Sequence, residues 1–406
     1  MRVALQGRRC VSALQEKQKE PMMDFAFSEE QGMIRETVRN FMSRECPRDV
    51  AKKTDESGQF PSGLFGTIKE MGFCGLTVPE AYGGGGPNTL GAVLVAEELA
   101  SLYPSLAAVF IASAFCGGNT ISSMGSPEQK RRFLPDLVQG ASLFAYAFRE
   151  RDEAYGGGPV KTTAAASGDA YLLNGVKSWV RLADRADYFL VTATTDPGKE
   201  PPGGMTVFIV DAKSNGISIQ AADAVGFDSV NLCEVVFKDV AVGASDILGG
   251  PEMLGRGGEQ FERLIDSENL EVAGVAVGLA QGAFEYASQY AKDRVQFGKP
   301  IVDFGAVRHM LVDMAVKIRS ARMLAYQAAW RNDRGENNAI ESAVARVTAV
   351  EAAHSAAFDC VQVLGGYGYA REYDAQRYLR DSLVMLTGGE TIETIKDRIA
   401  ETLSLG

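Results

Sequence analysis

Apolar and polar positions follow three successive patterns along the chain. From Ser28 to about Met124 the apolar residues recur at helical spacing, and the first stretch, SEEQGMIRETVRNFMSREC, opens with a serine and an acidic first turn, as a helix start should. Between about Phe144 and Leu248 the pattern changes to short β-rich runs separated by Gly, Asp, Asn and Pro turns. Long helical stretches follow, with Ala and Gly on faces that permit close packing.

This order of helices, strands and helices predicts an α+β multidomain fold and excludes a doubly wound parallel sheet. We expect an N-terminal α-helical domain over residues 23–143, a middle antiparallel, β-barrel-like domain over 144–248 and a C-terminal four-helix domain over 249–406. Residues 1–22 are expected to form a disordered extension ahead of these domains. The glycine-rich loop VPEAYGGGGPN follows no strand, so it is not interpreted as a phosphate-binding loop.

The composition narrows the functional classes. With 46% hydrophobic residues, the chain of 406 residues has ample material for a large buried core. The formal net charge of -11 disfavours nucleic-acid binding, because neutralising phosphates requires concentrated Lys and Arg. The six cysteines are scattered without a CxxC pair, and the chain has only two histidines. We therefore expect no metal site and no disulfide framework.

The pattern of apolar residues also bears on localisation. The chain contains no uninterrupted run of about 18 apolar residues, so no membrane span is expected. The basic N-terminal segment lacks the apolar stretch of a secretory signal. We expect a cytoplasmic protein, and the mitochondrial matrix is the alternative, although Glu16 and Glu20 fit a mitochondrial presequence poorly.

Five collinear segments together resemble the acyl-CoA dehydrogenase family. They are VPEAYGGGG with AEELA, YLLNGVKSW, KDRVQFGKPIVDF, VQVLGGYGYAREY and RYLRD, within a similarity that extends from about Met23 to Leu405. The resemblance implies the three domains described above, assembled around FAD as a homotetramer or dimer, with a heterotetramer as a further alternative. It also implies an acyl-CoA or acyl-carrier-protein substrate and an electron-transfer flavoprotein as partner.

The reaction that the resemblance implies is an α,β-dehydrogenation. A carboxylate removes the α-proton of an acyl thioester while a hydride passes from the β-carbon to flavin N5. The α-carbon is a weak acid, so such a site must stabilise the developing enolate and hold the base, the substrate and the flavin in line. A desolvated carboxylate with a raised pKa suits the role of base.

Several residues match positions at which the family holds FAD. Arg294, with Gln296 and Phe297 beside it, matches the arginine that reaches the pyrophosphate of a neighbouring subunit's FAD, and a planar guanidinium suits that task. Gln362, Gly365 and Gly366 match the turn at the adenine half, where glycines permit close backbone approach. The further residues assigned to the cofactor are Thr391, Trp179, Tyr146 and Phe148, of which Trp179 matches the tryptophan beside the flavin.

The middle region departs from the family pattern. Arg149 stands where a threonine that contacts the flavin is usual, Tyr155 where serine is common, and Arg181 in KSWVRL replaces the threonine of the family's W-I-T. Gly305 occupies a position that is frequently glutamine. Two interpretations stay open: Arg149 and Arg181 bind an anionic part of the flavin or an acidic substrate, or the subunit has a weakened flavin site, as in heteromeric family members.

The catalytic base is the main question. RDSLVMLTGGET aligns with the family's R-D-x-x-V-x-x-I-Y-E-G-T, so Gly389 stands where the usual glutamate is and Glu390 follows it. A shift of one residue points a side chain in another direction, so Glu390 does not simply inherit the role. Isovaleryl-type and long-chain-type members instead take the base from a D-x-E-R-L segment. The matching segment here is LIDSENLEVAG, which places Glu268 on that glutamate and Asn269 on the arginine.

We therefore predict Glu268 as the base, with Glu390 as the alternative and with neither as a further one. The structural readings are a first-turn helix acid for Glu268 and a capping carboxylate for Glu390. Asp266 and Glu271, on the same segment as Glu268, are expected to be surface partners. The functional readings are an acyl thioester dehydrogenase, a family member with non-oxidative thioester chemistry such as elimination, and a non-catalytic subunit of a heteromeric enzyme.

Overall fold

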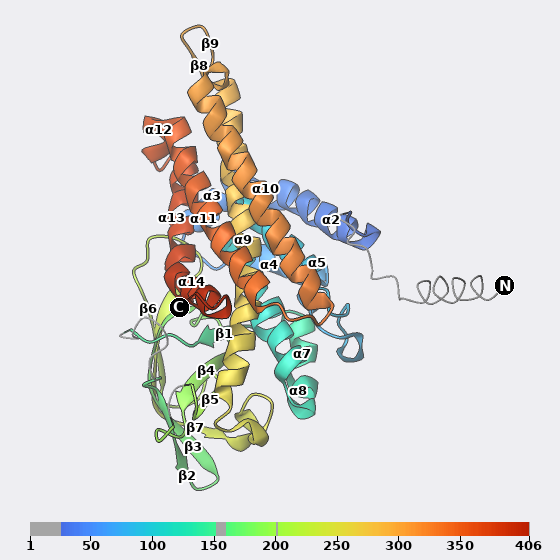
Figure 1. Cartoon of the computed structure of the whole chain (residues 1–406), viewed down its shortest axis with the longest axis vertical. Coiled ribbons are helices and arrows are strands. Elements are labelled where there is room, and N and C mark those ends of the chain that lie inside the picture. Colours follow the sequence, from blue (N-terminus) through green and yellow to red (C-terminus); the bar gives the residue numbers. More distant parts are fainter. Residues whose placement is uncertain (1–25, 152–159, 200–201, 406) are drawn as a thin grey trace, which may run out of the picture.

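The fold combines two helical parts with one sheet (Figure 1). The computed structural model describes residues 26–151, 160–199 and 202–405, and all structural statements below concern these residues. The expected extension over residues 1–22 lies outside them. The N-terminal helices are α2 (Glu29–Glu45), α3 (Arg48–Glu56), α4 (Ser62–Glu70), α5 (Thr89–Leu102), α6 (Pro104–Ile111), a π-helical segment (Ala112–Asn119), α7 (Thr120–Met124) and α8 (Pro127–Val138), with 3₁₀ turns at Phe73–Gly75 and Glu80–Tyr82.

The first described helix begins where the sequence predicts. Ser28 is the N-cap of α2, and its side chain and that of Gln31 form a reciprocal capping box with the backbone. Ile34, Val38 and Phe41 recur along one face of α2 and are buried. This amphipathic stripe packs the helix against the remaining N-terminal helices and stabilises it far more than local propensity does.

The segment Pro104–Met124, which spans α6, the π-helical segment and α7, forms the centre of the N-terminal part. By length and composition it is apolar enough to cross a membrane, but 89% of its most apolar window is buried inside the protein. Burial on this scale identifies the core helix of a folded domain rather than a lipid-facing one. It supplies one wall of the candidate site described below.

The middle region is a seven-stranded sheet with the strand order β1-β4-β2-β3-β7-β6, and β5 pairs with β4 off this path. Its strands are β1 (Phe144–Ala147), β2 (Thr163–Ser167), β3 (Ala170–Arg181), β4 (Tyr188–Thr194), β5 (Met205–Asp211), β6 (Ile217–Ala221) and β7 (Leu232–Gly243). Most pairs are antiparallel, as expected. However, β1 runs parallel to β4 along its whole length and β2 meets β4 at one parallel pair, so the sheet is mixed.

The C-terminal part is a bundle around one long helix. Its elements are α9 (Gly257–Asp293), the hairpin β8 (Val295–Gln296) and β9 (Lys299–Pro300), α10 (Gly305–Asp333), α11 (Ala339–Leu364), α12 (Gly366–Tyr369), α13 (Ala375–Thr387) and α14 (Ile392–Thr402), with 3₁₀ turns at Ala244–Asp246, Pro251–Met253 and Ile301–Asp303. The 37 residues of α9 give it a length of about 55 Å. The sheet lies beside one end of the bundle, and the β8–β9 hairpin and α12 lie at the other end (Figure 1).

Small residues on α9 allow the close packing that the sequence predicts. A Cβ atom added at Gly278 would lie 2.1 Å from the carbonyl oxygen of Glu97 on α5, and one added at Gly282 would lie 1.8 Å from that of Ser101. Neither position admits a side chain, so α5 and α9 touch backbone to backbone. This contact fixes the N-terminal helices on the bundle.

An aromatic cluster joins the three regions. Phe133 of α8 packs edge to face on Phe144 of β1, with ring centroids 5.6 Å apart, and on Tyr188 of β4 at 5.0 Å. Phe148, after β1, packs on Phe261 of α9 at 5.4 Å. Since such pairs bury large apolar areas in fixed geometry, they hold the sheet edge against the first turns of α9. The candidate site lies at this junction.

Candidate active site

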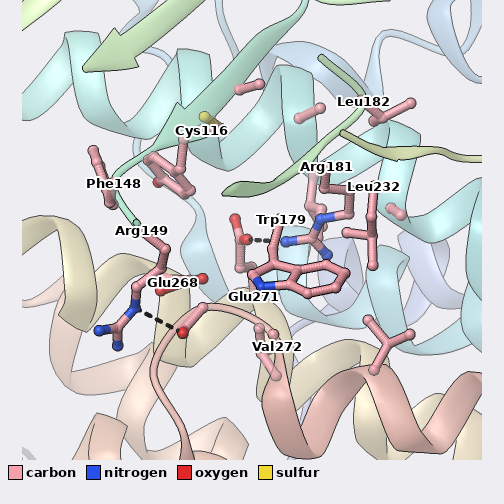
Figure 2. Close-up of a pocket in the computed structure, with 18 of the residues that line it drawn as sticks. Cys116, Phe148, Arg149, Trp179, Arg181, Leu182, Leu232, Glu268, Glu271 and Val272 are labelled. Carbon is pink, nitrogen blue, oxygen red and sulfur yellow. Dashed lines mark hydrogen bonds and ion pairs between the residues drawn. The ribbon is translucent and has the colours of Figure 1, made fainter. Parts of the chain in front are cut away.

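A pocket opens where the helices, the sheet and the loop after α13 meet (Figure 2). The segment Pro104–Met124 supplies apolar residues, and α9 supplies both apolar residues and the carboxylates of Glu268 and Glu271. Further polar groups come from β3, from the residue Arg149 after β1 and from the loop 388–389. The lining of the pocket includes Cys116, Tyr146, Phe148, Arg149, Ser178, Trp179, Arg181, Glu268, Glu271, Val272 and Val275. The pocket therefore brings together the predicted base, the predicted aromatic wall and both of the arginines that depart from the family pattern.

Glu268 and Gly389 occupy complementary positions. Glu268 lies about three turns into α9 and is 5% exposed. A Cβ atom added at Gly389 would lie 2.2 Å from its Oε1 atom, and the φ of Gly389 is +67°, a conformation that side chains rarely adopt. The carboxylate of Glu268 thus fills the space that a side chain at 389 would need, and the structure accommodates one or the other.

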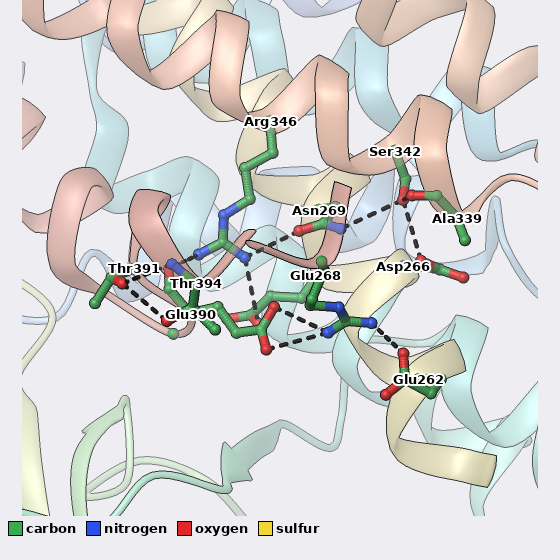
Figure 3. A network of polar contacts seen from close by, with 12 residues as sticks. Glu262, Asp266, Glu268, Asn269, Ala339, Ser342, Arg346, Glu390, Thr391 and Thr394 are labelled. Carbon is green, nitrogen blue, oxygen red and sulfur yellow. Dashed lines mark hydrogen bonds and ion pairs between the residues drawn. The ribbon is translucent and has the colours of Figure 1, made fainter. Parts of the chain in front are cut away.

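Arg346 on α11 supplies the positive charge that Asn269 lacks (Figure 3). Its Nη1 atom lies 3.4 Å from Oε2 of Glu268 and donates to Oδ1 of Asn269 at 3.2 Å. The guanidinium is completely buried. Sequence reasoning missed this residue; its signal was a single charge on an otherwise Ala- and Val-rich face of a buried helix.

Two arginines, Arg346 and Arg149, hold the backbone of the loop from Gly388 to Glu390. Arg346 donates to the carbonyl oxygens of Gly388 and Glu390 at 2.7 and 2.9 Å, and Arg149 donates to that of Gly389 at 2.8 Å. Hydrogen bonds from a charged guanidinium are stronger than those between two neutral groups. They fix the backbone that faces Glu268.

Glu390, the alternative base, has a different environment. Its carboxylate accepts two hydrogen bonds from Arg398 of α14 at 3.0 and 3.1 Å, and Arg149 lies 3.9 Å away. Burial raises the pKa of Glu390, and Arg398 and Arg149 oppose that rise. Its side chain is not part of the pocket lining. The cap of α14 is Thr391, whose hydroxyl accepts from the backbone N–H of Thr394, so Glu390 serves as an ion-pair partner and not as the expected cap.

The expectation that Glu271 lies at the surface is wrong. The residue is 1% exposed and faces the pocket, because residues three apart on a helix share a face and Glu268 faces inward. Nη2 of Arg181 lies 3.4 Å from its Oε1 atom (Figure 2). Burial raises the pKa of Glu271 to about 8, against the opposing charge of Arg181. Asp266 is half-buried and accepts a hydrogen bond from Ser342, so it is not a surface residue either.

The aromatic wall of the pocket contains a strained residue. Trp179 lies in β3 at a register shift between Lys177 and Val180, has a φ of +59° and is 56% exposed. A large aromatic residue in this backbone conformation is costly, and such strain persists at functional sites. The rings of Tyr146 in β1 and Phe148 just after it lie with their centroids 4.9 Å apart. These rings offer apolar faces next to polar groups.

Two buried polar atoms of the pocket have no hydrogen-bond partner among the residues that the structure describes. They are Oγ of Ser178 and Oε2 of Glu271, both in nearly inaccessible side chains. Buried polar atoms are ordinarily hydrogen-bonded, so each indicates a group that a bound molecule supplies. Aromatic faces beside unpaired polar atoms fit a flat heterocycle with hydrogen-bonding edges, such as the flavin ring.

A second group of predicted residues lies at the far end of the bundle. Arg294, Gln296, Gly365 and Gly366 line one surface hollow together with Tyr367, and the guanidinium of Arg294 lies 5.5 Å from the Tyr367 ring centroid. Since Arg294 ends the helix that carries Glu268, the two sites are about 39 Å apart along α9. The structure thus brings these residues to each other but not to the pocket.

The remaining predicted residues that the structure describes line neither the pocket nor the far hollow. Phe297, at the tip of the β8–β9 hairpin, is 92% exposed, and Gln362 is exposed on the last turn of α11. Thr391 caps α14, and Gly305 starts α10 with open space around it. Tyr155 lies outside the described residues.

Comparison with known proteins covers nearly the whole chain. The models of the acyl-CoA dehydrogenase N-terminal, middle and C-terminal domains match residues 28–141, 145–240 and 255–404. A probable acyl-CoA dehydrogenase of Bacillus subtilis is 34% identical over 94% of this chain and 100% of its own length. A subunit of the caffeyl-CoA reductase-Etf complex of Acetobacterium woodii is 34% identical over 88% of this chain and 94% of its own length.

Solved structures agree with the sequence comparisons. Butyryl-CoA dehydrogenase from Megasphaera elsdenii superposes with a TM-score of 0.89 at 30% identity, over 94% of this chain and 100% of that one. The order of the three matched domains is the order of the helical, sheet and bundle regions observed here. The chain belongs to the acyl-CoA dehydrogenase family.

Proposed function

We propose that the protein is an FAD-dependent dehydrogenase of an acyl thioester, carried by coenzyme A or an acyl carrier protein, and that Glu268 is its base. The observation that carries the proposal is the steric complementarity of Glu268 and Gly389 in the pocket. A family member needs one carboxylate at this place, and here only the one from α9 has room for it. The lining of the pocket supports the cofactor, since Trp179, Tyr146 and Ser178 fit a flavin ring.

The side chains around Glu268 suit the removal of an α-proton. Arg346 holds one carboxylate oxygen, which leaves the other directed toward Gly389 and the pocket. Glu268 is 5% exposed, so bulk water screens the charge of its carboxylate only weakly. A flavin held beside Trp179, Tyr146 and Ser178 would supply the hydride acceptor. Backbone and side-chain donors near the thioester carbonyl would stabilise the developing enolate.

Purified protein provides the test of this activity. It should be yellow, and an acyl thioester should bleach its flavin under anaerobic conditions. A flavin that stays oxidised while product forms would indicate elimination instead. A colourless chain that requires a second subunit for activity would indicate a non-catalytic role.

The Etf complex of the relative from Acetobacterium woodii supports an electron-transfer flavoprotein as the electron acceptor of the reduced flavin.

Gly389→Ala is expected to slow flavin reduction about a hundredfold. Its Cβ atom would displace the carboxylate of Glu268, and a misplacement of about 1 Å at a reacting group costs about that factor. Gly335→Ala is the matched control, because Gly335 has the same φ of +67° with nothing within 4 Å. Both variants should lose about 1–2 kcal/mol of stability from the backbone alone. Equal flavin-reduction rates in Gly389→Ala and Gly335→Ala, measured by stopped-flow absorbance, would refute the steric argument.

We also propose that Arg294 and its neighbours bind the FAD of another subunit. The distance of about 39 Å along α9 separates them from the pocket of their own chain, so a second copy must bring the two sets together. Exposed aromatic residues beside the far hollow, Phe297 and Tyr369, suit such an interface. A homodimer or homotetramer satisfies this arrangement.

Arg294→Gln is expected to weaken FAD binding about 10- to 150-fold, the loss of one charge-assisted hydrogen bond to phosphate. The measurement is the Kd of FAD for the deflavinated protein, together with the oligomeric state from light scattering. Lys299→Gln is the control, because Lys299 is a cation on the β8–β9 hairpin that follows Arg294 but does not line the hollow. If the two variants bind FAD with the affinity of the unchanged protein, Arg294 has no cofactor role.

A further inference from the structure

Glu271 is a second buried carboxylate within the pocket, one helical turn beyond Glu268. Of its two oxygens, only Oε1 has a partner, the guanidinium of Arg181 at 3.4 Å. The other, Oε2, has no hydrogen-bond partner among the described residues. Burying an unpaired carboxylate oxygen is expensive for a protein, so a group that binds in the pocket is the natural partner.

The surroundings of Glu271 are apolar on the side away from Glu268. Val272 and Val275 of α9 and Cys116 of the π-helical segment continue the pocket lining. Burial raises the pKa of the Cys116 thiol as well, with the nearby charge of Glu271 adding to the effect. An acyl chain that enters from the Glu268 side would pass Glu271 a few bonds beyond its α-carbon, since three residues of helix span about 4.5 Å.

The cations near the pocket already have acidic or carbonyl partners. Arg181 contacts Glu271, and Arg346 contacts Glu268. Arg149 donates to the carbonyl of Gly389. Of the two unpaired polar atoms described above, Oγ of Ser178 and Oε2 of Glu271, the second belongs to a carboxyl group, which in its ionised form only accepts hydrogen bonds. This argues against an acidic acyl group and in favour of one that donates a hydrogen bond.

We propose that Glu271, oriented by Arg181, is a specificity residue that accepts a hydrogen bond from a hydroxyl or amino group on the acyl chain of the substrate. This inference rests on the proposed thioester dehydrogenase function and narrows its substrate class. A pocket built around such a donor rejects an analogue without it, because the carboxylate is then left unpaired. Burial raises the pKa of Glu271 to about 8, so the free carboxyl group is mostly protonated at neutral pH, and a bound ammonium group would favour its ionised form.

The test is a set of binding measurements on the FAD-loaded protein. The ligands are acyl-pantetheine amides of one chain length, which carry the arm common to coenzyme A and carrier proteins and have a less acidic α-carbon than thioesters. One has no substituent, one a γ-hydroxyl, one a γ-amino group and one a terminal carboxylate. Calorimetry should show the hydroxyl or the amino ligand bound at least about tenfold more tightly than the unsubstituted ligand.

Two variants isolate Glu271. Glu271→Leu should remove or invert the preference, and it should favour the unsubstituted ligand. Glu271→Gln keeps the shape and an acceptor but carries no charge, so it should lose an amino preference by at least about tenfold and keep a hydroxyl preference. The isosteric variant preserves the test if the leucine variant does not fold. Circular dichroism and flavin content check both.

Two results would contradict the role proposed for Glu271. Unchanged ligand preference in both variants would show that Oε2 of Glu271 faces the cofactor or solvent instead of the substrate. Tightest binding of the carboxylate ligand would overturn the proposal and assign the site to Arg181. Bleaching of the flavin by thioesters is measured separately. Its failure would contradict the dehydrogenase function without affecting the ligand preference.

Discussion

Glu268→Gln is expected to slow flavin reduction by an acyl thioester at least about a hundredfold, and up to about ten-thousandfold, while the flavin content stays unchanged. Glutamine retains the size of the side chain and its contact with Arg346, but it does not take up the α-proton. Stopped-flow absorbance under anaerobic conditions measures the rate. A comparable rate in Glu268→Gln and the unchanged protein would assign the base elsewhere.

Glu390→Gln is the matched control for that variant. Glu390 is also a buried glutamate next to Gly389, but Arg398 holds both of its oxygens and its side chain does not line the pocket. Its substitution should lower stability, because it removes the partner of a buried charge, and should leave flavin reduction within a few-fold of the original rate. The opposite ranking of the two variants would favour the base in the C-terminal loop.

Arg346→Met is expected to lower the free energy of unfolding by about 3–5 kcal/mol, the cost of breaking a buried ion pair by removing one partner. The substitution leaves the carboxylate of Glu268 without its cation and the carbonyls of Gly388 and Glu390 without their donor. Urea denaturation followed by circular dichroism measures the change. Flavin reduction should slow as well, since the same arginine holds the base.

The control for Arg346→Met is Lys396→Met. Lys396 pairs with Glu351, and both side chains are about half exposed, so water screens the pair. The loss should be below about 1 kcal/mol. Similar losses in the two variants would mean that Arg346 contributes no more than a surface charge. A double variant, Arg346→Met with Glu268→Gln, should lose less than the sum of the single losses, because the two side chains interact directly.

The sequence predicts the architecture better than the pairing of strands. Capping residues, helical periodicity and turn residues locate α2 and the β region, and the glycines of α9 indicate close packing. The parallel alignment of β1 with β4 has no local signature, because the chain between them forms β2 and β3 and returns. Such pairing depends on tertiary contacts.

In the candidate site, too, the sequence indicates some features and only the structure shows the others. The gap at Gly389 and the segment around Glu268 point to one displaced carboxylate, and the structure places both at one point. Arg346 lies on another helix, so no spacing in the sequence relates it to Glu268. Glu271 was misjudged, although its position one turn from Glu268 in a run of Val, Ala and Gly indicated burial.

The most direct test of the account is the exchange of the α-hydrogen of a bound acyl thioester with deuterated solvent, followed by nuclear magnetic resonance. This exchange reports on the base itself and needs no electron acceptor. We expect the unchanged protein and Glu390→Gln to incorporate deuterium at the α-carbon and Glu268→Gln to show no enzyme-catalysed incorporation. Exchange at the original rate in Glu268→Gln, together with its loss in Glu390→Gln, would contradict the assignment of the base to α9.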